Sequence, residues 1–220
     1  MVSFKVNDEQ SIQVSPGLKE GENSLNHVAL QVADAEALRA YLAKQGIKTP
    51  AKVGRGQHKN LNFTIKDPAG FTIEFTEDTP EGWTVRDKGK FMPETRISDH
   101  ISHVGVVVTD TPATLHFYGD ILGLKQTRRP TSSDDTIPRY NMIVPESGDY
   151  VELMNEAKSG QHVCMDVPDA DKAKAKLEGS PYRPKYEKPI TQRVGKNGKR
   201  IVEVYDPDGI RVEFMENNAK

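Results

Sequence analysis

The sequence predicts an α+β fold that is built from a repeated module. Three observations predict it. A short strand that runs from a histidine to an aspartate occurs three times, a short amphipathic helix follows each copy, and further strands follow each helix. Internal repetition of this kind indicates that each copy is one supersecondary unit. The module is therefore a strand and a helix followed by two or three more strands.

The first strand of each module has a histidine at its start and an aspartate at its end. The copies read HVALQVAD at 27–34, HVGVVVTD at 103–110 and HVCMDVPD at 162–169. An aspartate just before a helix accepts hydrogen bonds from backbone N–H groups that the first turn leaves unpaired. Asp34, Asp110 and Asp169 are therefore predicted to be N-caps.

A short helix is predicted after each aspartate, because apolar residues recur there at helical spacing and a glycine ends the pattern. The apolar positions and the glycines that follow them are Leu38, Tyr41, Leu42 and Gly46; Leu115, Tyr118, Leu122 and Gly123; and Ala173, Leu177 and Gly179.

The strands after the helices are nearly the same in the first and third copies, LNFTIKDPAGFTIEFTE and IVEVYDPDGIRVEFME. DPAG at 67–70 and DPDG at 206–209 are predicted turns, because proline presets φ and glycine takes positive φ. The middle copy, NMIVPESGDYVELMN, has another turn and the same ending. At the N-terminus, VSFKVNDEQSIQVSPG predicts a strand, a turn and a strand, as at the end of a module whose start is missing.

These modules divide the chain into two predicted domains. The first is residues 1–78, with a partial module at 1–17 and a full module at 25–78. Residues 79–100 contain Pro, Gly and many charges, which is typical of a linker. The second domain is residues 101–216, with full modules at 101–156 and 160–216.

The alternation of side chains along a strand places each module's histidine on the face away from the helix. In the second module His103 and Gly105 share one face, whereas Val104, Val106 and Val108 share the other. The all-apolar face is expected to pack under the helix. The histidine is therefore expected on the opposite, concave face.

A glutamate in the last strand of each module follows the same rule. Glu74, Glu152 and Glu213 each lie between two large apolar residues and so point away from the apolar face. A strand histidine or glutamate that faces water is the simpler explanation for any single pair. The repetition of the pair favours a divalent metal site, because neutral imidazole and carboxylate are metal ligands. The candidate set is His103, Glu152, His162 and Glu213.

Composition excludes several classes of partner. The net charge of −2 gives no basic face for nucleic acid. No apolar run approaches the ~20 residues of a membrane span. The single cysteine, Cys164, excludes an internal disulfide framework. The N-terminus does not resemble a signal peptide, so a cytoplasmic location is expected for this chain.

The chain resembles the vicinal oxygen chelate superfamily, which includes glyoxalase I, extradiol dioxygenases and the fosfomycin- and bleomycin-resistance proteins. The resembling segments are SHVGVVVTDTPATLHFYGDILGL, YVELMN, QHVCMDVPDADKAKAKL and VYDPDGIRVEFME, which cover nearly all of 101–216. The resemblance implies βαβββ modules that pair into open, cup-shaped mixed β-sheets with the helices outside. It also implies one metal, held by the first and last strands of each module, and the His103, Glu152, His162 and Glu213 set looks like the glyoxalase I pattern.

The same resemblance implies an incomplete N-terminal cup. Residues 25–78 look like the second module of a cup and 1–17 like the tail of its first. Gln13 falls where Glu152 falls, so Gln13, His27 and Glu74 form a candidate weak second site without a catalytic role. The missing strand leaves an open sheet edge. Either the chain is shorter than its relatives or a second chain completes the cup, as in a homodimer.

Three functions remain open. A glyoxalase-like lyase or isomerase would hold Zn, Ni, Co or Mn, and Glu213 or Glu152 would abstract a proton from a small oxygenated substrate. An extradiol-type dioxygenase would hold Fe(II) on His103, His162 and Glu213. Against the dioxygenase, Glu152 fills a position that those enzymes leave open, and Glu203 occupies the place of their tyrosine. The third function is a non-catalytic binding or resistance protein, whose cups usually lack the metal residues.

Overall fold

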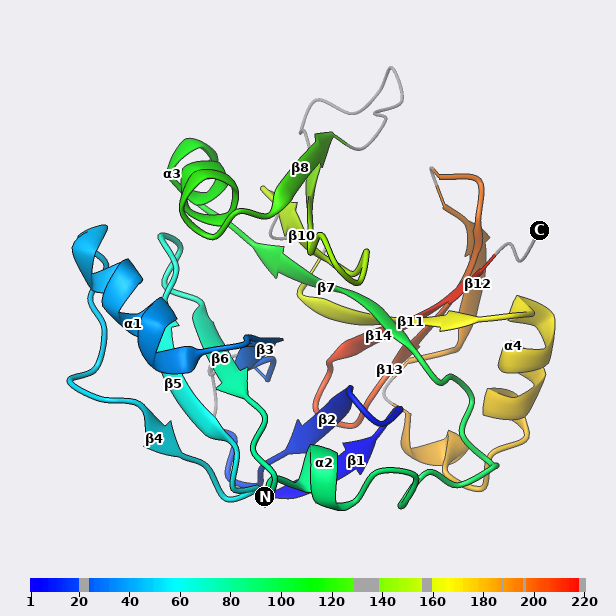
Figure 1. Ribbon diagram of the computed structural model, residues 1–220. Coiled ribbons are helices and arrows are strands. Elements are labelled where there is room, and N and C mark those ends of the chain that lie inside the picture. Colours follow the sequence, from blue (N-terminus) through cyan, green and yellow to red (C-terminus); the bar gives the residue numbers. More distant parts are fainter. Residues whose placement is uncertain (20–23, 129–138, 156–159, 187, 196, 218–220) are drawn as a thin grey trace. The chain divides into compact units, whose positions relative to one another are not determined.

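The computed structural model describes residues 1–19, 24–128, 139–155, 160–186, 188–195 and 197–217 (Figure 1). Contacts divide the chain into two compact units. Unit 1 comprises Met1–Leu25, Met92–Thr109 and Leu124–Lys220, and unit 2 comprises Asn26–Phe91 and Asp110–Gly123.

Unit 1 contains one curved mixed sheet of eight strands in the order β12-β13-β14-β11-β7-β10-β9-β8 (Figure 1). The strands are β7 (Ile101–Val107), β8 (Lys125–Arg128), β9 (Arg139–Ile143), β10 (Tyr150–Met154), β11 (His162–Val167), β12 (Thr191–Val194), β13 (Arg200–Tyr205) and β14 (Arg211–Glu216). In each half the first strand pairs in parallel with the last, β7 with β10 and β11 with β14. The two halves join through the antiparallel pair β7 and β11. This order confirms the prediction of two four-stranded modules that pair into a mixed sheet.

The apolar face of the second half packs under α4 (Ala170–Glu178), as its alternating pattern predicts. The buried members of this core are Val6, Met165, Val167, Ala170, Ala173, Leu177, Ile190, Val202, Val204 and Phe214. A short 3₁₀ turn, η3 (Arg183–Lys185), follows α4 in the chain. His162, Cys164 and Asp166 alternate with Val163, Met165 and Val167, which leaves the opposite face for polar side chains.

The N-terminal hairpin belongs to unit 1 by its contacts. Its strands β1 (Val2–Lys5) and β2 (Ser11–Val14) pair antiparallel, as predicted. Gln10, just before β2, hydrogen-bonds both backbone groups of Ile101 at the start of β7. Its Nε2 donates to the carbonyl at 2.9 Å, and its Oε1 accepts from the N–H at 2.7 Å. The residue before β2 thereby hydrogen-bonds to the first residue of β7, a central strand of the eight-stranded sheet.

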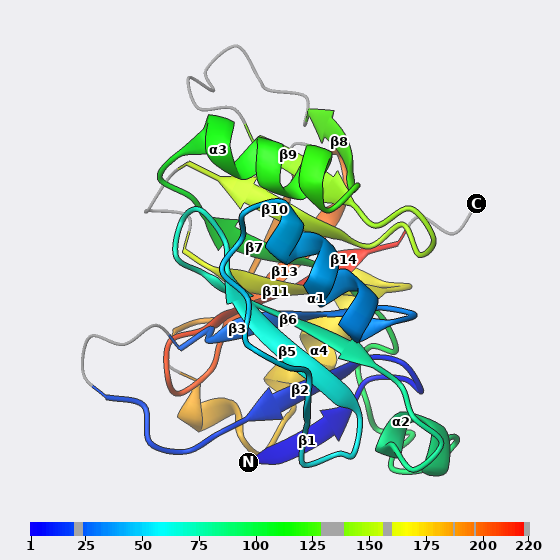
Figure 2. The same cartoon turned by 60° about the vertical axis from the view of Figure 1, so that its left-hand side comes forward.

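Unit 2 contains a third copy of the module. Its sheet has the order β3-β6-β5-β4, with β3 (His27–Gln31) parallel to β6 (Thr72–Glu77) and with β5 (Leu61–Lys66) and β4 (Gly54–Arg55) antiparallel. Helix α1 (Ala35–Lys44) covers one face of this sheet (Figure 2). The short helix α2 (Trp83–Arg86) lies in the predicted linker, where Trp83 stacks on His58 with ring centroids 4.4 Å apart.

The helix that follows β7 in sequence also belongs to unit 2. It begins as α3 (Thr111–Leu115) and continues as the π-helix η1 (His116–Ile121). The Tyr118 hydroxyl donates to Oδ2 of Asp67 at 3.1 Å, and the Tyr41 hydroxyl of α1 donates to the carbonyl of Ile121 at 3.0 Å. Burial raises the pKa of both Tyr118 and Asp67. These bonds tie α3 and η1 to the sheet and helix of unit 2.

The three predicted N-caps are confirmed. Asp34, Asp110 and Asp169 each accept a hydrogen bond from the backbone N–H three residues later, at 2.8, 3.0 and 3.0 Å. The two predicted turns are confirmed as well, because Gly70 and Gly209 both have φ of 82°. The division of the chain into cups at 1–78 and 101–216 stays a prediction. Position 156, where one predicted module ends, lies outside the described residues.

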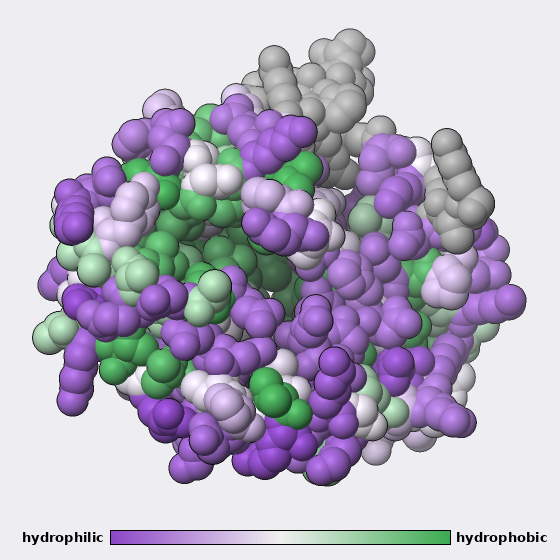
Figure 3. Space-filling model, in the orientation of Figure 1, coloured by the Kyte–Doolittle hydropathy of each residue, from purple (hydrophilic) through white to green (hydrophobic). Residues whose placement is uncertain are grey.

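The surface is largely polar. Hydrophilic residues cover much of the face drawn in Figure 3, which agrees with a charged fraction of 28%. Across the described ranges, each helix is too short or too polar to span a lipid bilayer.

Candidate metal centre

The register of four central strands brings the predicted donors of unit 1 to one face. In one cross-strand row Glu152 of β10 lies opposite Gly105 of β7, and Gly105 lies opposite His162 of β11. In the next row His103 lies opposite Cys164, and Cys164 lies opposite Glu213 of β14. Two adjacent rows of one sheet face therefore carry all four residues.

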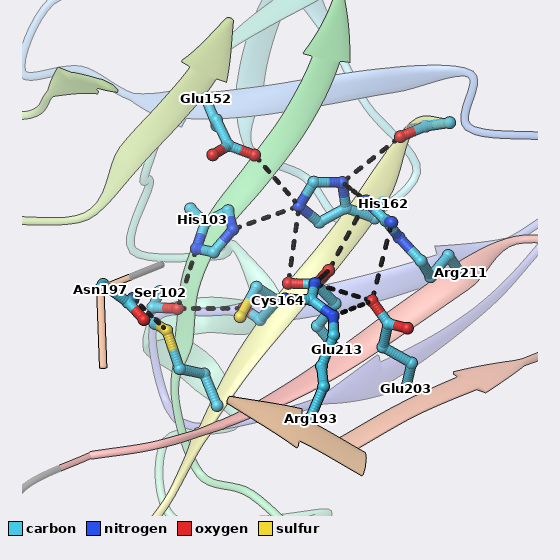
Figure 4. Close-up of polar contacts among 12 residues, drawn as sticks. Ser102, His103, Glu152, His162, Cys164, Arg193, Asn197, Glu203, Arg211 and Glu213 are labelled. Carbon is cyan, nitrogen blue, oxygen red and sulfur yellow. Dashed lines mark hydrogen bonds and ion pairs between the residues drawn. The ribbon is translucent and has the colours of Figure 1, made fainter. Parts of the chain in front are cut away.

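The four side chains converge and are buried (Figure 4). Nε2 of His162 lies 3.2 Å from Nε2 of His103, 3.6 Å from Oε2 of Glu152 and 3.9 Å from Oε2 of Glu213. None of the four residues is more than 5% exposed. Ligand atoms about 2.0–2.2 Å from a tetrahedral zinc ion lie roughly 3.3–3.6 Å from one another. The three distances to Nε2 of His162 are close to this spacing, although the ligand atoms of all four residues do not lie within 4.8 Å of one another.

Cys164 is a rival donor in the same place. Among the described residues, two groups have ligand atoms within 4.8 Å of one another: His103, Glu152 and His162, and His103, Cys164 and Glu213. The Cys164 side chain is fully buried, and burial raises the pKa of its thiol. A thiol that stays protonated is a poor ligand. The set of two imidazoles and two carboxylates stays a prediction, because neither group contains both Glu152 and Glu213.

Gly105 makes room for His162. A Cβ at position 105 would lie 2.1 Å from Cε1 of His162 and 2.3 Å from its Nδ1, which are closer than real contacts allow. The His162 ring thus lies over the backbone of β7, between the carboxylate of Glu152 and the imidazole of His103. The sequence contains this signal, because Gly105 interrupts a run of valines at the strand centre.

His103 is held on two sides. Its ring stacks on Tyr150 with centroids 4.4 Å apart and an interplanar angle of 13°. Its Nδ1 lies 3.3 Å from the hydroxyl of Ser102, which also interacts with the carboxylate of Asp166. The hydroxyl can accept a hydrogen bond from Nδ1–H, and in that tautomer Nε2 offers a lone pair. The ring therefore presents Nε2 toward the other donors.

Two arginines and a third glutamate complete the site, and sequence reasoning missed the arginines. Arg193 donates to Oε1 of Glu203 at 2.8 Å and to Oε1 of Glu213 at 3.3 Å. Arg211 lies 2.7 Å from Nδ1 of His162 and 3.5 Å from Oε1 of Glu213. The alternation of side chains along β14 places Arg211 on the same face as Glu213, two residues away. The sequence could have indicated Arg211 by this spacing.

Burial shapes the protonation of the site. Burial and then the Arg211 charge lower the pKa of His162 to about 4. Its imidazole is therefore neutral near pH 7, as a ligand must be. Burial raises the pKa of Glu213, although Arg211 and Arg193 oppose this shift. Glu213 consequently holds a proton more readily than an exposed glutamate does.

The candidate second site is only partly assembled within one unit. In unit 2, Nε2 of His27 lies 3.2 Å from Oε2 of Glu74, whose Oε1 accepts a hydrogen bond from Asn62 at 2.7 Å. The hydrogen bond with His27 lowers the pKa of Glu74. Gln13 lies on β2 of unit 1, where its side chain is exposed. A weak site of Gln13, His27 and Glu74 stays a prediction.

Comparisons with known proteins identify glyoxalases and a dioxygenase as similar proteins. Glyoxalase I of Saccharomyces cerevisiae is 21% identical in an alignment 228 residues long. The alignment covers 92% of this chain and 67% of the yeast protein. The crystal structure of a catechol 2,3-dioxygenase matches with a TM-score of 0.64 at 14% identity, over 87% of this chain and 68% of that one. The Mn(II)-bound glyoxalase from Novosphingobium aromaticivorans matches with a TM-score of 0.64 at 16% identity, over 87% of this chain and 62% of that one.

The family is established by a match to residues 100–214, which are more than half of the chain and contain all four converging donors. The structural likenesses support the same fold, because both solved structures match 87% of this chain at a TM-score of 0.64. The chain belongs to the Glyoxalase/Bleomycin resistance protein/Dioxygenase superfamily.

Proposed function

We propose that unit 1 binds a divalent metal (Zn, Ni, Co or Mn) and acts as a glyoxalase-like lyase or isomerase on a small oxygenated substrate. The observation that carries the proposal is that buried donor atoms of His103, Glu152 and Glu213 lie 3.2–3.9 Å from Nε2 of the buried His162. These four residues would hold the metal. When bound there, a divalent metal would serve as a Lewis acid toward a substrate oxygen.

The residues of the chain would supply the proton transfer. Glu213 is the stronger candidate for the base, because burial raises its pKa toward the range in which a carboxylate accepts a proton from carbon. Glu152 approaches the same nitrogen of His162 from the other half of the sheet and is the alternative base. The base would take the proton from the carbon next to a carbonyl and return it to a neighbouring position.

An extradiol-type dioxygenase on Fe(II) is the alternative. It would use His103, His162 and Glu213 and leave the remaining positions open. Glu152 stands against it, since its carboxylate lies 3.6 Å from Nε2 of His162. Glu203 stands against it too, because it occupies the place of the tyrosine of those enzymes, and its carboxylate instead pairs with Arg193 at 2.8 Å. The identity of the bound metal separates the two reactions.

The first test is the metal content of protein purified without added metal, by elemental analysis. We expect near-stoichiometric Zn, Ni, Co or Mn in the wild type and its loss in His162→Ala. His116→Ala is the matched control, because that histidine is exposed on η1 and pairs with Asp120. Iron in place of these metals would favour the dioxygenase. No metal, and none taken up on titration, would leave a non-catalytic small-molecule binding protein.

The second test concerns the reaction class. The metal-loaded protein is incubated with α-hydroxycarbonyl compounds in deuterium oxide, and proton magnetic resonance follows deuterium at the carbon next to the carbonyl. We expect exchange in the wild type and its loss in Glu213→Gln with metal still bound. Exchange that persists in Glu213→Gln and disappears in Glu152→Gln would assign the base to Glu152 instead.

A further inference from the structure

Arg211 lies against two of the four residues that we propose as metal ligands. Its Nη2 is 2.7 Å from Nδ1 of His162 and 3.5 Å from Oε1 of Glu213, and its side chain is 13% exposed. A guanidinium group only donates hydrogen bonds. Nδ1 of His162 must therefore accept, and the proton of the neutral ring must lie on Nε2.

This tautomer of His162 cannot bind a metal through Nε2, the nitrogen that faces His103 and Glu152. Binding needs the lone pair on Nε2 and the proton on Nδ1. The carbonyl of Gly160 lies 3.4 Å from Nδ1 and can accept that proton. Nδ1 thus has two alternative partners. The Arg211 donor suits the metal-free ring, and the Gly160 acceptor suits the metal-bound ring.

The balance of charge also indicates that a bound metal would take partners away from Arg211. Three carboxylates, those of Glu152, Glu203 and Glu213, lie with the guanidinium groups of Arg193 and Arg211 on this part of the sheet. A divalent ion held by Glu152 and Glu213 would leave Glu203 as the counter-charge for two guanidinium groups. A buried charge without a partner is costly.

Arg211 already has a donor to spare. Its Nε is buried and makes no hydrogen bond to any residue that the structure describes. Guanidinium groups bind carboxylate and phosphate oxygens through paired N–H donors. An oxyanion is therefore the ligand that would best replace the hydrogen-bond partners of Arg211 once Glu213 and His162 bind a metal.

We propose that Arg211 and the metal compete for His162 and Glu213, and that the displaced Arg211 binds a carboxylate or phosphate group of the substrate. The proposal rests on the proposed metal site. Metal and oxyanion would then bind with positive cooperativity. The metal would free Arg211 for the oxyanion, and the oxyanion would give Arg211 a partner in place of His162 and Glu213. The substrate would be a small oxygenated compound with an anionic group near the carbons that react.

The test is calorimetric titration of zinc into metal-free protein, with the wild type, Arg211→Gln and Arg200→Gln compared. Arg200 is the matched control, because it also pairs with carboxylates, those of Asp171 and Glu216, away from the four donors. We expect Arg211→Gln to bind zinc at least about fivefold more tightly than the wild type, in the usual range of coupling between sites. Arg200→Gln should match the wild type.

The second part of the test repeats the zinc titration with chloride replaced by acetate at constant ionic strength. Acetate should tighten zinc binding by the wild type and leave Arg211→Gln unchanged. Equal or weaker zinc binding by Arg211→Gln would overturn the proposal, as would an equal acetate effect in both proteins. If Arg211→Gln fails to fold, Arg193→Gln replaces it, since Arg193 also donates to Glu213. A wild type that binds no zinc would instead defeat the proposed metal site itself.

Nitrogen-15 spectra of the histidines add a readout that a purely structural role would not change. The metal-free wild type should show His162 with its proton on Nε2, and zinc-loaded protein should show the proton on Nδ1. A metal-free ring with its proton already on Nδ1 would contradict the role given to Arg211.

Discussion

Gly105 shows how strongly one position can control the site. A Cβ at this position would meet the His162 ring at 2.1 Å, and His162 is only 1% exposed, so the ring has little room to move. We predict that Gly105→Ala lowers metal affinity at least about tenfold, as loss of ligand positioning does in metal sites. Metal titration of the purified variant measures this.

The matched control is Gly54→Ala on β4. A Cβ there would lie 3.6 Å from Asn62, which is an ordinary contact. Gly54→Ala should bind metal as the wild type does. Wild-type metal affinity in Gly105→Ala would show that His162 is not held over β7 in the way described here.

The shared sheet face of the four candidate donors could be predicted from the sequence, whereas their surroundings could not. His103 and Glu152 recur at matching places in the other modules, and strand alternation gives their face. Arg193 and Arg211 carry no such repetition. Their contacts with Glu213 depend on the register of β12, β13 and β14, which a single sequence does not determine.

Among the elements, the N-caps give the clearest energetic prediction. Asp169 accepts a hydrogen bond from the N–H of Lys172 at 3.0 Å at the start of α4. Loss of such a cap costs about 1 kcal/mol. Asp169→Ala should therefore lower the free energy of unfolding by about 1 kcal/mol, measured from urea unfolding curves at pH 7.

Asp169→Ser is the control, because a serine hydroxyl can accept the same bond. It should keep most of the stability that the alanine variant loses. Equal losses in the two variants would mean that the carboxylate acts through its charge and not through the cap.

The helix after β7 shows that apolar spacing predicts a helix but not its type. The spacing of Leu115, Tyr118 and Leu122 predicts one regular helix. The structure instead widens the second half into a π-helix, with the N–H of Leu122 bonded to the carbonyl of Phe117 at 3.0 Å. Both Phe117 and Tyr118 are buried. Packing within unit 2 accompanies this change, and the apolar spacing alone does not encode it.

At the scale of the whole molecule, repetition made the fold predictable. Each module pairs its first strand in parallel with its last, and the order of strand, helix and hairpin is repeated in each. The association of segments across the chain was not predictable in this way. The hairpin at 1–17 hydrogen-bonds to Ile101, and α3 joins unit 2, through contacts that no local pattern signals.

The stability of the metal-free protein should depend on pH through His162. Its pKa in the folded protein is about 4, below the ordinary value of 6.5, because burial and Arg211 oppose its charge. Between these values the unfolded state binds more protons than the folded state. The contribution of His162 to stability is therefore complete above pH 6.5 and is lost as the pH falls toward 4.

His162→Gln removes this dependence, and the comparison of the two proteins isolates it. Glu213 acts in the opposite sense, because its raised pKa favours the folded state at low pH and the benefit is lost as pH rises. It is present in both proteins and so cancels to a first approximation. Between pH 7 and pH 5 the wild type should lose about 2 kcal/mol more than His162→Gln, from about 1.4 kcal/mol for each pH unit below 6.5. Urea unfolding with a chelator at both pH values measures the difference, and parallel losses in the two proteins would show that His162 is protonated equally in the folded and unfolded states.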